Sequence, residues 1–250
     1  MTTLAQKLRH GTQQSHTLAE NTAYMKCFLK GVVEWESFRQ LLANLYYVYA
    51  TLEAALSRHK NHQIIRKIYF PELHRTEKLA QDLAFYYGEN WQQEIQPTPN
   101  GKVYVDRLHT LANHDPVLLI AHCYTRYLGD LSGGQSLKTI VRSALALPDG
   151  YGTAMYEFDA LPTPGDRHQF KATYRDALND LPLDAVTIER IVAEANDAFA
   201  LNRDVMHDLE NLIKTAIGAH TFALLTRQDR PGSTEARSTR HQAVALMVAE

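Results

Sequence analysis

The fold is decided by the stretch Tyr124-Thr-Arg-Tyr-Leu-Gly-Asp-Leu-Ser-Gly-Gly-Gln135, near the middle of the chain. The residues on both sides of it have a helical pattern, yet Gly129, Gly133 and Gly134 fall close together inside it. Each glycine inside a helix costs about 1 kcal/mol relative to alanine, so three together give up about 2–3 kcal/mol. Gly129 and Gly133 lie one turn apart and, with Ser132, leave one helix face almost as bare backbone. We expect a kink there, with either a flat ligand or a closely crossing helix against that face.

Helical periodicity also dominates the rest of the chain, and no segment shows the sustained alternation of a strand. We therefore expect an all-α protein, with one multi-helical domain over residues 1–225 and a flexible polar tail over residues 226–250. The Gly/Pro-rich connection over residues 148–165 contains several large apolar side chains, which indicates that it is packed. The expected helices cover residues 3–20, 35–58, 72–87, 102–113, 115–147, 166–181 and 184–225, the last with Asp184 as its N-cap.

The composition is that of an ordinary globular protein, with 45% hydrophobic and 22% charged residues. The net charge is −2, so no overall field favours nucleic acid or an anionic membrane as a partner. The first residues lack the apolar core of a signal peptide, and no uncharged run approaches the length that spans a bilayer. Cys27 and Cys123 lie far apart in the sequence and indicate neither a zinc site nor a disulfide framework. We expect a cytoplasmic protein.

Among the 12 histidines, His16 stands out because Glu20 follows it by one helical turn. A carboxylate that holds one imidazole nitrogen is the usual support of a metal-ligating histidine. Arg9 lies on the same face, about 10 Å away along the helix axis. That separation is close to the distance from the iron of a porphyrin to its propionates. The alternative is an ordinary hydrogen bond on a helix surface.

Two further pairs of charged residues have i, i+4 spacing. Arg126 and Asp130 lie in the glycine-containing stretch, where they form either part of a site or a solvated ion pair. Lys171 and Arg175 form either an exposed basic helix face or, together with Arg9, a set of cations for two carboxylates.

Three other polar or aromatic residues have an ordinary structural interpretation as well as a functional one. Tyr49 fits a core aromatic whose hydroxyl is hydrogen-bonded. Phe199 and Asn202, spaced i, i+3, fit packing and capping positions.

Rival catalytic sites lack their motifs in this sequence. A di-iron carboxylate bundle needs Glu-x-x-His pairs on two helices. No histidine here has a glutamate three residues before it, and the nearest approaches are Asp106/His109 and Asp204/His207. Neither a Gly-x-Ser-x-Gly elbow nor a phosphate-binding P-loop occurs.

Several segments, taken in order along the chain, carry a resemblance to a known family. They are Gln14-Ser-His-Thr-Leu-Ala-Glu-Asn21, Tyr69-Phe-Pro-Glu-Leu73, Gln81-Asp-Leu-Ala-Phe-Tyr-Tyr-Gly88, Ala121-His-Cys-Tyr-Thr-Arg-Tyr-Leu-Gly-Asp-Leu-Ser-Gly-Gly-Gln135 and Glu194-Ala-Asn-Asp-Ala-Phe-Ala-Leu-Asn202. Together they resemble the heme oxygenase family from about Leu4 to Leu225. The glycine-containing segment is highly specific for that family.

The resemblance implies an all-α, single-domain fold in which heme b is sandwiched between a proximal helix and a kinked distal helix. Heme is then both cofactor and substrate, and dioxygen as co-substrate together with electrons opens it at the alpha-meso carbon. The products implied are biliverdin IX-alpha, carbon monoxide and ferrous iron. His16 corresponds to the family's proximal iron ligand, and Glu20 to the partner of that ligand.

The resemblance also assigns the remaining site residues. Asp130 matches the distal carboxylate that holds a proton-donating water, and Tyr49, Arg126 and Gly129 match residues beside it. Positions around the heme propionates are matched by Arg9, Tyr124, Lys171 and Arg175. Other positions that contact heme are matched by Met25, Phe28, Thr125, Gly129, Ser132, Gly133, Gly134, Phe199 and Asn202.

Some positions depart from the family pattern. Arg9 stands where many relatives have lysine, which keeps the charge but changes the geometry of binding. Gln13 lacks a positive charge that some relatives have at that edge. The sequence lacks the membrane anchor of animal relatives and is similar to the soluble forms of photosynthetic microbes. That similarity implies reduced ferredoxin as the electron donor and a bilin reductase of phycobilin biosynthesis as a downstream partner.

Two alternatives to a heme oxygenase activity stay open. The first is a non-catalytic protein that binds or delivers heme, although such a protein has no need for a distal carboxylate such as Asp130. The second is a relative of the same architecture with a thiaminase-like hydrolytic activity. That activity needs an activated cysteine, and neither Cys27 nor Cys123 has an obvious base beside it.

Overall fold

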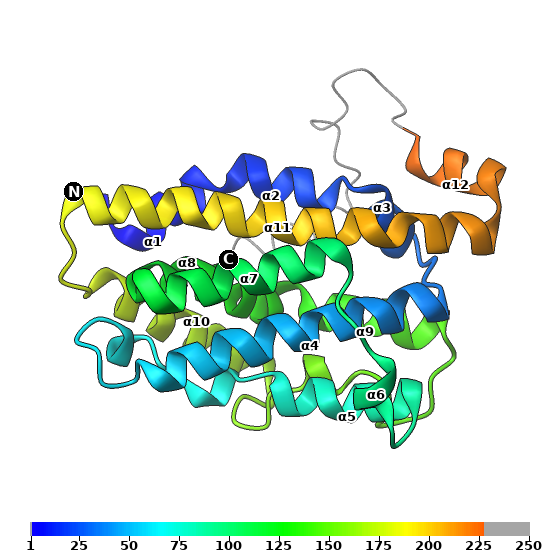
Figure 1. Ribbon diagram of the computed structural model, residues 1–250, viewed down its shortest axis with the longest axis horizontal. Helices are drawn as coiled ribbons and strands as arrows, with labels where there is room; N and C mark the ends of the chain where they lie inside the picture. The colour runs from blue at the N-terminus through cyan, green and yellow to red at the C-terminus, as the bar shows by residue number, and fades with distance from the viewer. Residues whose placement is uncertain (1, 228–250) are drawn as a thin grey trace.

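The computed structural model describes residues 2–227, and this part of the chain is helical without a strand. In Figure 1 one long helix, α11, runs along the length of the molecule. The first three helices lie along one side of it, and α4 and α7 pack along another. The bounds of these elements are α1 Leu4–Gly11, α2 Gln13–Glu20, α3 Ala23–Leu29, α4 Trp35–Arg58, α7 Pro99–His114 and α11 Ala185–Ile217.

The remaining elements are shorter and complete the layers around this framework. They are η1 Ile65–Lys67, η2 Pro71–Leu73, α5 Thr76–Tyr87, α6 Trp91–Glu94, η3 Pro116–Leu118, α8 Leu119–Cys123, η4 Tyr124–Leu128, α9 Gly129–Ala144, η5 Ala154–Tyr156, α10 Pro164–Asn179 and α12 Ala219–Thr226. No helix within residues 2–227 is both long enough and apolar enough to cross a membrane. The predicted tail begins at residue 226, and residues 228–250 lie outside the described part.

Two helices begin as the sequence predicts, because their first backbone N–H groups are capped by a side chain. α4 occupies the predicted range, and the carboxylate of Glu34 accepts hydrogen bonds from the N–H groups of Glu36 and Ser37. α11 begins after Asp184, whose side chain accepts from the N–H of Thr187 at 2.7 Å. Such caps stabilise a helix by about 1 kcal/mol each.

The helix predicted over residues 3–20 is wrong in one respect, because it is broken in two at Thr12. The backbone of Thr12 is non-helical at φ −107° and ψ 1°, and its hydroxyl donates to the carbonyl of Leu8 at 2.7 Å. Leu18, on α2 beyond the break, is 45% exposed. Helix 184–225 is likewise divided, at Gly218, whose φ of +82° is readily adopted only by glycine.

Where the sequence led us to expect a kink, a π-helical turn directly precedes the glycines. η4, over Tyr124–Leu128, is π-helical and directly precedes Gly129 at the start of α9. Single π-helical turns inside α-helices occur frequently at functional sites and are a known cause of helix kinks. The segment predicted as one helix over residues 115–147 is therefore a sequence of η3, α8, η4 and α9.

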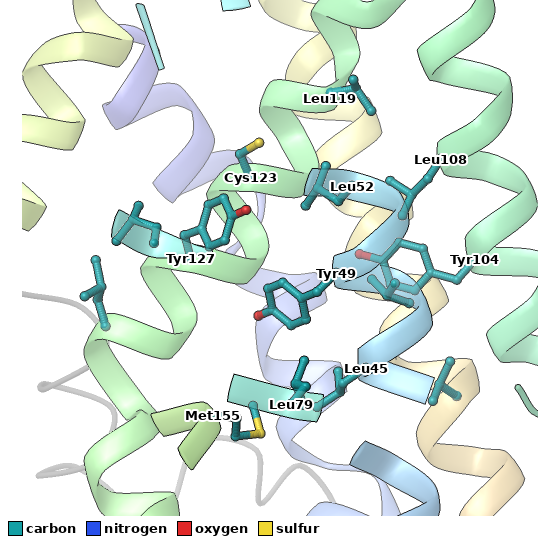
Figure 2. Packing of buried hydrophobic residues seen from close by; sticks show 14 of the residues in the cluster. Leu45, Tyr49, Leu52, Leu79, Tyr104, Leu108, Leu119, Cys123, Tyr127 and Met155 are labelled. Atoms are coloured by element: carbon teal, nitrogen blue, oxygen red, sulfur yellow. The ribbon is translucent and has the colours of Figure 1, made fainter. Parts of the chain in front are cut away.

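Part of the hydrophobic core lies between α4, η4, α5 and α7. Figure 2 shows Tyr49 inside it, between Tyr127 and Leu79, and all three side chains are buried. The connection after α9 packs against this core, as predicted, with Tyr156 and Phe158 buried. Tyr49 therefore carries its polar hydroxyl into an apolar interior, where that group requires a hydrogen-bond partner.

Candidate functional site

A hydrogen-bonded network supplies the partners of Tyr49. Its hydroxyl donates to Oδ2 of Asp130 at the start of α9. Arg126 in η4 donates from Nε to the Tyr49 oxygen at 3.2 Å and from Nη1 to Oδ1 of Asn202 at 2.5 Å. Nη2 of Arg126 lies 4.0 Å from Oδ1 of Asp130. α4, the consecutive elements η4 and α9, and α11 thus contribute to one network around a buried carboxyl group.

The proton affinity of this carboxyl group is set by opposing effects. Burial raises the pKa of Asp130, while the charge of Arg126 and the hydrogen bond from Tyr49 lower it, and the net shift is upward. Burial also raises the pKa of Tyr49, so the phenol stays protonated and remains a donor. Asp130 therefore takes up a proton at a higher pH than an exposed aspartate does, which suits a group that handles protons.

His16 lies on α2, with an imidazole ring that is partly exposed. Its Nδ1 faces Oε2 of Glu20 at 3.6 Å, which leaves Nε2 as the nitrogen that could ligate a metal. The ring also meets Phe199 of α11 edge to face, with the ring centroids 5.6 Å apart. The predicted pairing of His16 with Glu20 is therefore present in the structure.

One turn of α11 joins the histidine to the buried network. Phe199 contacts His16, and Asn202 binds Arg126 one turn further along the same helix. Residues that follow each other at i, i+3 lie on one helix face. The candidate ligand and the candidate proton-handling group are therefore brought to the same side of α11.

Gly129 exposes its backbone to open space beside this network. A Cβ atom built on Gly129 would meet nothing within 4 Å, whereas one built on Gly134 would lie 3.2 Å from Cδ1 of Tyr156. Gly133 is buried, and Ser132 is partly exposed. The sequence left two reasons for the glycines, a flat ligand or a closely packed neighbour. The open space beside Gly129 fits the ligand, and the contact of Gly134 with Tyr156 fits close packing.

A group of cations gathers around Tyr124. Burial raises the pKa of Tyr124, and a hydrogen bond with Thr12 and the charges of Arg175 and Arg9 act in the opposite direction. These two arginines, from α10 and α1, therefore lie within electrostatic reach of one phenol. Lys171, one turn before Arg175, is buried. A histidine, an open glycine backbone and a set of cations together fit a heme with its two carboxylates.

The other predicted heme contacts occupy different surroundings. Phe28 is buried, with its ring centroid 6.2 Å from those of both Tyr24 and Phe38. The hydroxyl of Thr125 donates to the carbonyl of Ala121 at 2.9 Å. Met25, on α3, is partly exposed. Phe28 and Thr125 thus contact other residues of the protein core, and their roles toward heme stay predictions.

A buried acid that the sequence analysis did not single out lies one turn after Tyr49. Glu53 accepts from the N–H of Arg75 at 2.5 Å and from that of Thr76 at 3.2 Å. Burial lowers the pKa of Arg75. The negative charge of Asp130 raises it, more than any other neighbouring group does, but burial dominates. The i, i+4 spacing of Tyr49 and Glu53 on α4 was the signal available in the sequence.

A second missed cluster surrounds Glu194, which lies inside one of the quoted segments. Glu194 accepts from Nε of Arg107 at 3.0 Å, and its other recorded partner is Nε2 of His122 at 3.0 Å. Burial alone would raise the pKa of Glu194, but these hydrogen bonds hold it at about 2. The cluster ties α7 and α8 to α11.

The cysteine-dependent alternative receives no support from the thiols. Burial raises the pKa of both Cys27 and Cys123. A catalytic cysteine needs a lowered pKa, because the thiolate is the nucleophile. Residues 2–227 also contain no cluster of three or more His, Cys, Asp or Glu side chains that could hold a metal ion.

Comparison with known proteins gives a consistent result. The family model described as heme oxygenase matches residues 2–208. Heme oxygenase 2 of Synechocystis sp. PCC 6803 is 76% identical over the full length of both chains. Heme oxygenase 1 of the same organism is 55% identical over 93% of this chain and 95% of the relative. The crystal structure of the Synechocystis heme oxygenase-2 with heme and NO superposes with a TM-score of 0.90 at 77% identity, covering 94% of this chain and 96% of that chain.

Proposed function

Because the chain belongs to the heme oxygenase family, we propose that it opens heme at the alpha-meso carbon to biliverdin IX-alpha, carbon monoxide and ferrous iron. It is an oxidoreductase whose cofactor and substrate is heme, with dioxygen as co-substrate. The observation that carries the detailed proposal is the link, through one turn of α11, between the imidazole of His16 and the network around Asp130. A non-catalytic heme carrier would have no use for that network.

His16 would hold the heme iron through Nε2, with the carboxylate of Glu20 facing Nδ1 of the ring at 3.6 Å. When bound, heme supplies the iron that activates dioxygen and the tetrapyrrole that is oxidised. An imidazole is a weaker electron donor than a thiolate, which suits oxidation of the ring itself.

Asp130 would handle protons beside the bound heme. Its Oδ2 accepts from the hydroxyl of Tyr49, and Oδ1, 4.0 Å from Nη2 of Arg126, would accept from a water molecule beside the substrate. Arg126 fixes the Tyr49 oxygen, and Asn202 fixes Arg126. The raised pKa of Asp130 suits a carboxyl group that returns protons through such a water. Gly129 leaves the space that this water and dioxygen need.

The two propionates of heme would be held by the cations Arg9, Lys171 and Arg175 and by the phenol of Tyr124. These residues would thereby fix the rotation of heme and so control which isomer forms. The rest of the pocket wall is assigned to Met25, Phe28, Thr125, Ser132, Gly133, Gly134 and Phe199. Replacing Lys171 and Arg175 together should change the ratio of biliverdin isomers, measured by chromatography, more than it changes iron ligation.

Reduced ferredoxin is the proposed electron donor, a bilin reductase the proposed consumer of the product, and the cytoplasm the proposed location. The support is the similarity to cyanobacterial heme oxygenases along the whole chain. Arg9 and Arg175 near the propionate edge also suit docking of an acidic electron carrier.

The decisive experiment supplies the purified protein with hemin, ferredoxin, ferredoxin reductase, NADPH and an iron chelator under air. We expect the Soret band to disappear while the absorbance of biliverdin rises, with the alpha isomer as the product. A Soret band that persists without biliverdin, with ascorbate as well as with ferredoxin, would establish the heme carrier instead. Turnover with ascorbate alone would support the enzyme and reject the proposed donor.

The ligand assignment has its own test. The variant His16→Ala should lose the imidazole-ligated heme spectrum and the activity, and added imidazole should restore both. His10→Ala is the matched control, because His10 is an exposed residue of the preceding helix. A variant His16→Ala with the parent spectrum would exclude His16 as the ligand.

A further inference from the structure

Asn196 binds both sides of the break between α1 and α2. Its Nδ2 donates to the carbonyl of Gly11, the last residue of α1, at 3.1 Å, and to the carbonyl of Val192 at 2.9 Å. Its Oδ1 accepts from the hydroxyl of Ser15 on α2 at 2.6 Å. Ser15 directly precedes His16 in the sequence. One side chain of α11 thus holds the end of α1 and the turn of α2 that carries the histidine.

The chemistry of these partners fixes the orientation of the Asn196 amide. Both carbonyl oxygens can only accept, so the nitrogen of the amide must face Gly11 and Val192. The oxygen then faces Ser15, whose hydroxyl has to donate. Both N–H donors of the amide and one acceptor site of its oxygen are therefore used. Exchanging the positions of the amide nitrogen and oxygen would break these hydrogen bonds.

The backbone at the break is brought unusually close to α11. A Cβ atom built on Gly11 would lie 2.5 Å from Cγ1 of Val192, so a larger residue would push the end of α1 away. Thr12, the residue between the two helices, makes no side-chain capping bond to α2. The first turn of α2 therefore depends on contacts from α11 to hold its direction.

We propose that Asn196 is a positioning residue for His16: by fastening Gly11 and Ser15 to α11, it fixes the direction of α2 and with it the orientation of the imidazole toward the heme iron. This inference rests on the proposed role of His16 as the iron ligand. Phe199, on the same helix, supports the ring itself, whereas Asn196 holds the helix that carries the ring.

The first test needs no heme. Hydrogen exchange of the backbone amides of residues 16–20 in the heme-free protein should be about tenfold faster in Asn196→Ala than in the parent, because loss of the bonds lets α2 open locally. Asn179→Ala is the matched control, since Asn179 of α10 accepts a comparable bond, 3.0 Å long, from the N–H of Ala5 at the other end of α1. That control should leave exchange in α2 unchanged.

The second test reads the ligand bond in the heme complex of the full-length protein. Asn196→Ala should shift or broaden the iron–histidine stretching band in the resonance Raman spectrum of the ferrous form and should release heme to apomyoglobin about tenfold faster. Asn196→Asp should behave like the alanine variant, because a carboxylate would face two carbonyl oxygens. Asn179→Ala should match the parent in both measurements.

The outcomes separate this inference from the proposed function. If His16→Ala leaves the iron–histidine band in place, the ligand assignment itself fails. If His16→Ala abolishes the band while Asn196→Ala keeps the parent band and the parent rate of heme release, the positioning role of Asn196 is overturned, whatever the exchange experiment shows.

Discussion

Opposing effects act on the pKa of the Asp130 carboxyl group. Burial favours the protonated form, whereas Arg126 and the hydrogen bond from Tyr49 favour the carboxylate, and burial dominates. A carboxyl group in this state holds its proton to a higher pH than an exposed aspartate does.

The variant Asp130→Asn keeps the shape of the side chain but cannot carry this proton. We expect heme binding close to that of the parent and formation of biliverdin slower by about 100-fold or more, since positioned acid–base groups contribute 10²–10⁴-fold. The rate should be followed by biliverdin absorbance as a function of pH. A limb of the pH profile that lies above the ordinary pKa of aspartate should be present in the parent and absent in the variant.

Asp82 offers a control for that experiment. It is also a buried aspartate, with a pKa raised by burial to about 6, but its carboxylate accepts from the N–H groups of Ala154 and Met155. Asp82→Asn should therefore form biliverdin with the pH profile of the parent. Biliverdin formation by Asp130→Asn at the parent rate would remove Asp130 from the proposed mechanism.

At the level of single elements, α9 begins with Gly129. Glycine destabilises a helix, but at this position it leaves the space that we propose for heme and dioxygen. In Gly129→Ala the added methyl group meets no protein atom within 4 Å. The heme-free variant should be more stable by about 1 kcal/mol, because alanine favours the helix. That gain corresponds to a rise in melting temperature of about 2–4 °C for a chain of this size.

The same substitution should slow heme degradation, because the methyl group enters the space proposed for heme and dioxygen. Calorimetry of the heme-free protein and the biliverdin assay together test this. Gly134→Ala is the comparison, since its methyl group would lie 3.2 Å from the buried ring of Tyr156 and should bring no gain in stability. A more stable Gly129→Ala with unchanged turnover would show that this face does not lie against the substrate.

The sequence predicted elements where local signals suffice. Periodicity placed α4 correctly, and Asp184 was predicted as the N-cap of α11. The end of α11 at Gly218, whose φ is positive, was not predicted. The break at Thr12 was not predictable locally, because Asn196 and Val192, which hold it, lie far away in the chain. α3 was missed because seven residues carry too little periodicity.

The same distinction holds for the site. Resemblance to a family named Tyr49, Arg126, Asp130 and Asn202, and the structure joins them in one network. It did not assign a role to Glu53 or Asn196, whose partners come from other elements. Spacing along a helix shows which residues share a face, but not which distant element lies against that face.

For the molecule as a whole, the contacts of Glu194 that join α7, α8 and α11 make the stability of the fold depend on pH in the acid range. The folded pKa of Glu194, about 2, lies below the usual 4.5, despite burial, because His122 and Arg107 bind the carboxylate. An acid with a lowered pKa stabilises the fold above its unfolded pKa, and this contribution disappears as the pH falls toward the folded value. Glu194 should therefore contribute up to about 3 kcal/mol above pH 4.5, and this should be lost on acidification toward pH 2.

Urea denaturation between pH 6 and pH 2.5 measures this contribution. The stability of Glu194→Gln should fall less steeply with acidification below pH 4.5 than that of the parent, and the variant should be less stable above that pH. Glu157→Gln, which removes an exposed partner of Lys138, should keep the slope of the parent. Equal slopes for the parent and Glu194→Gln would contradict the role assigned to the cluster.

The turn of α11 from Phe199 to Asn202 constrains how this chain can change in evolution. Substitutions at either position alter one side of the pocket alone. A single inserted or deleted residue between them would instead rotate everything beyond it by about 100°, so that Arg126 would lose its partner although every amino acid was retained. Heme oxygenases of this type should therefore tolerate variation in the composition of α11 more readily than any change in its length at this point.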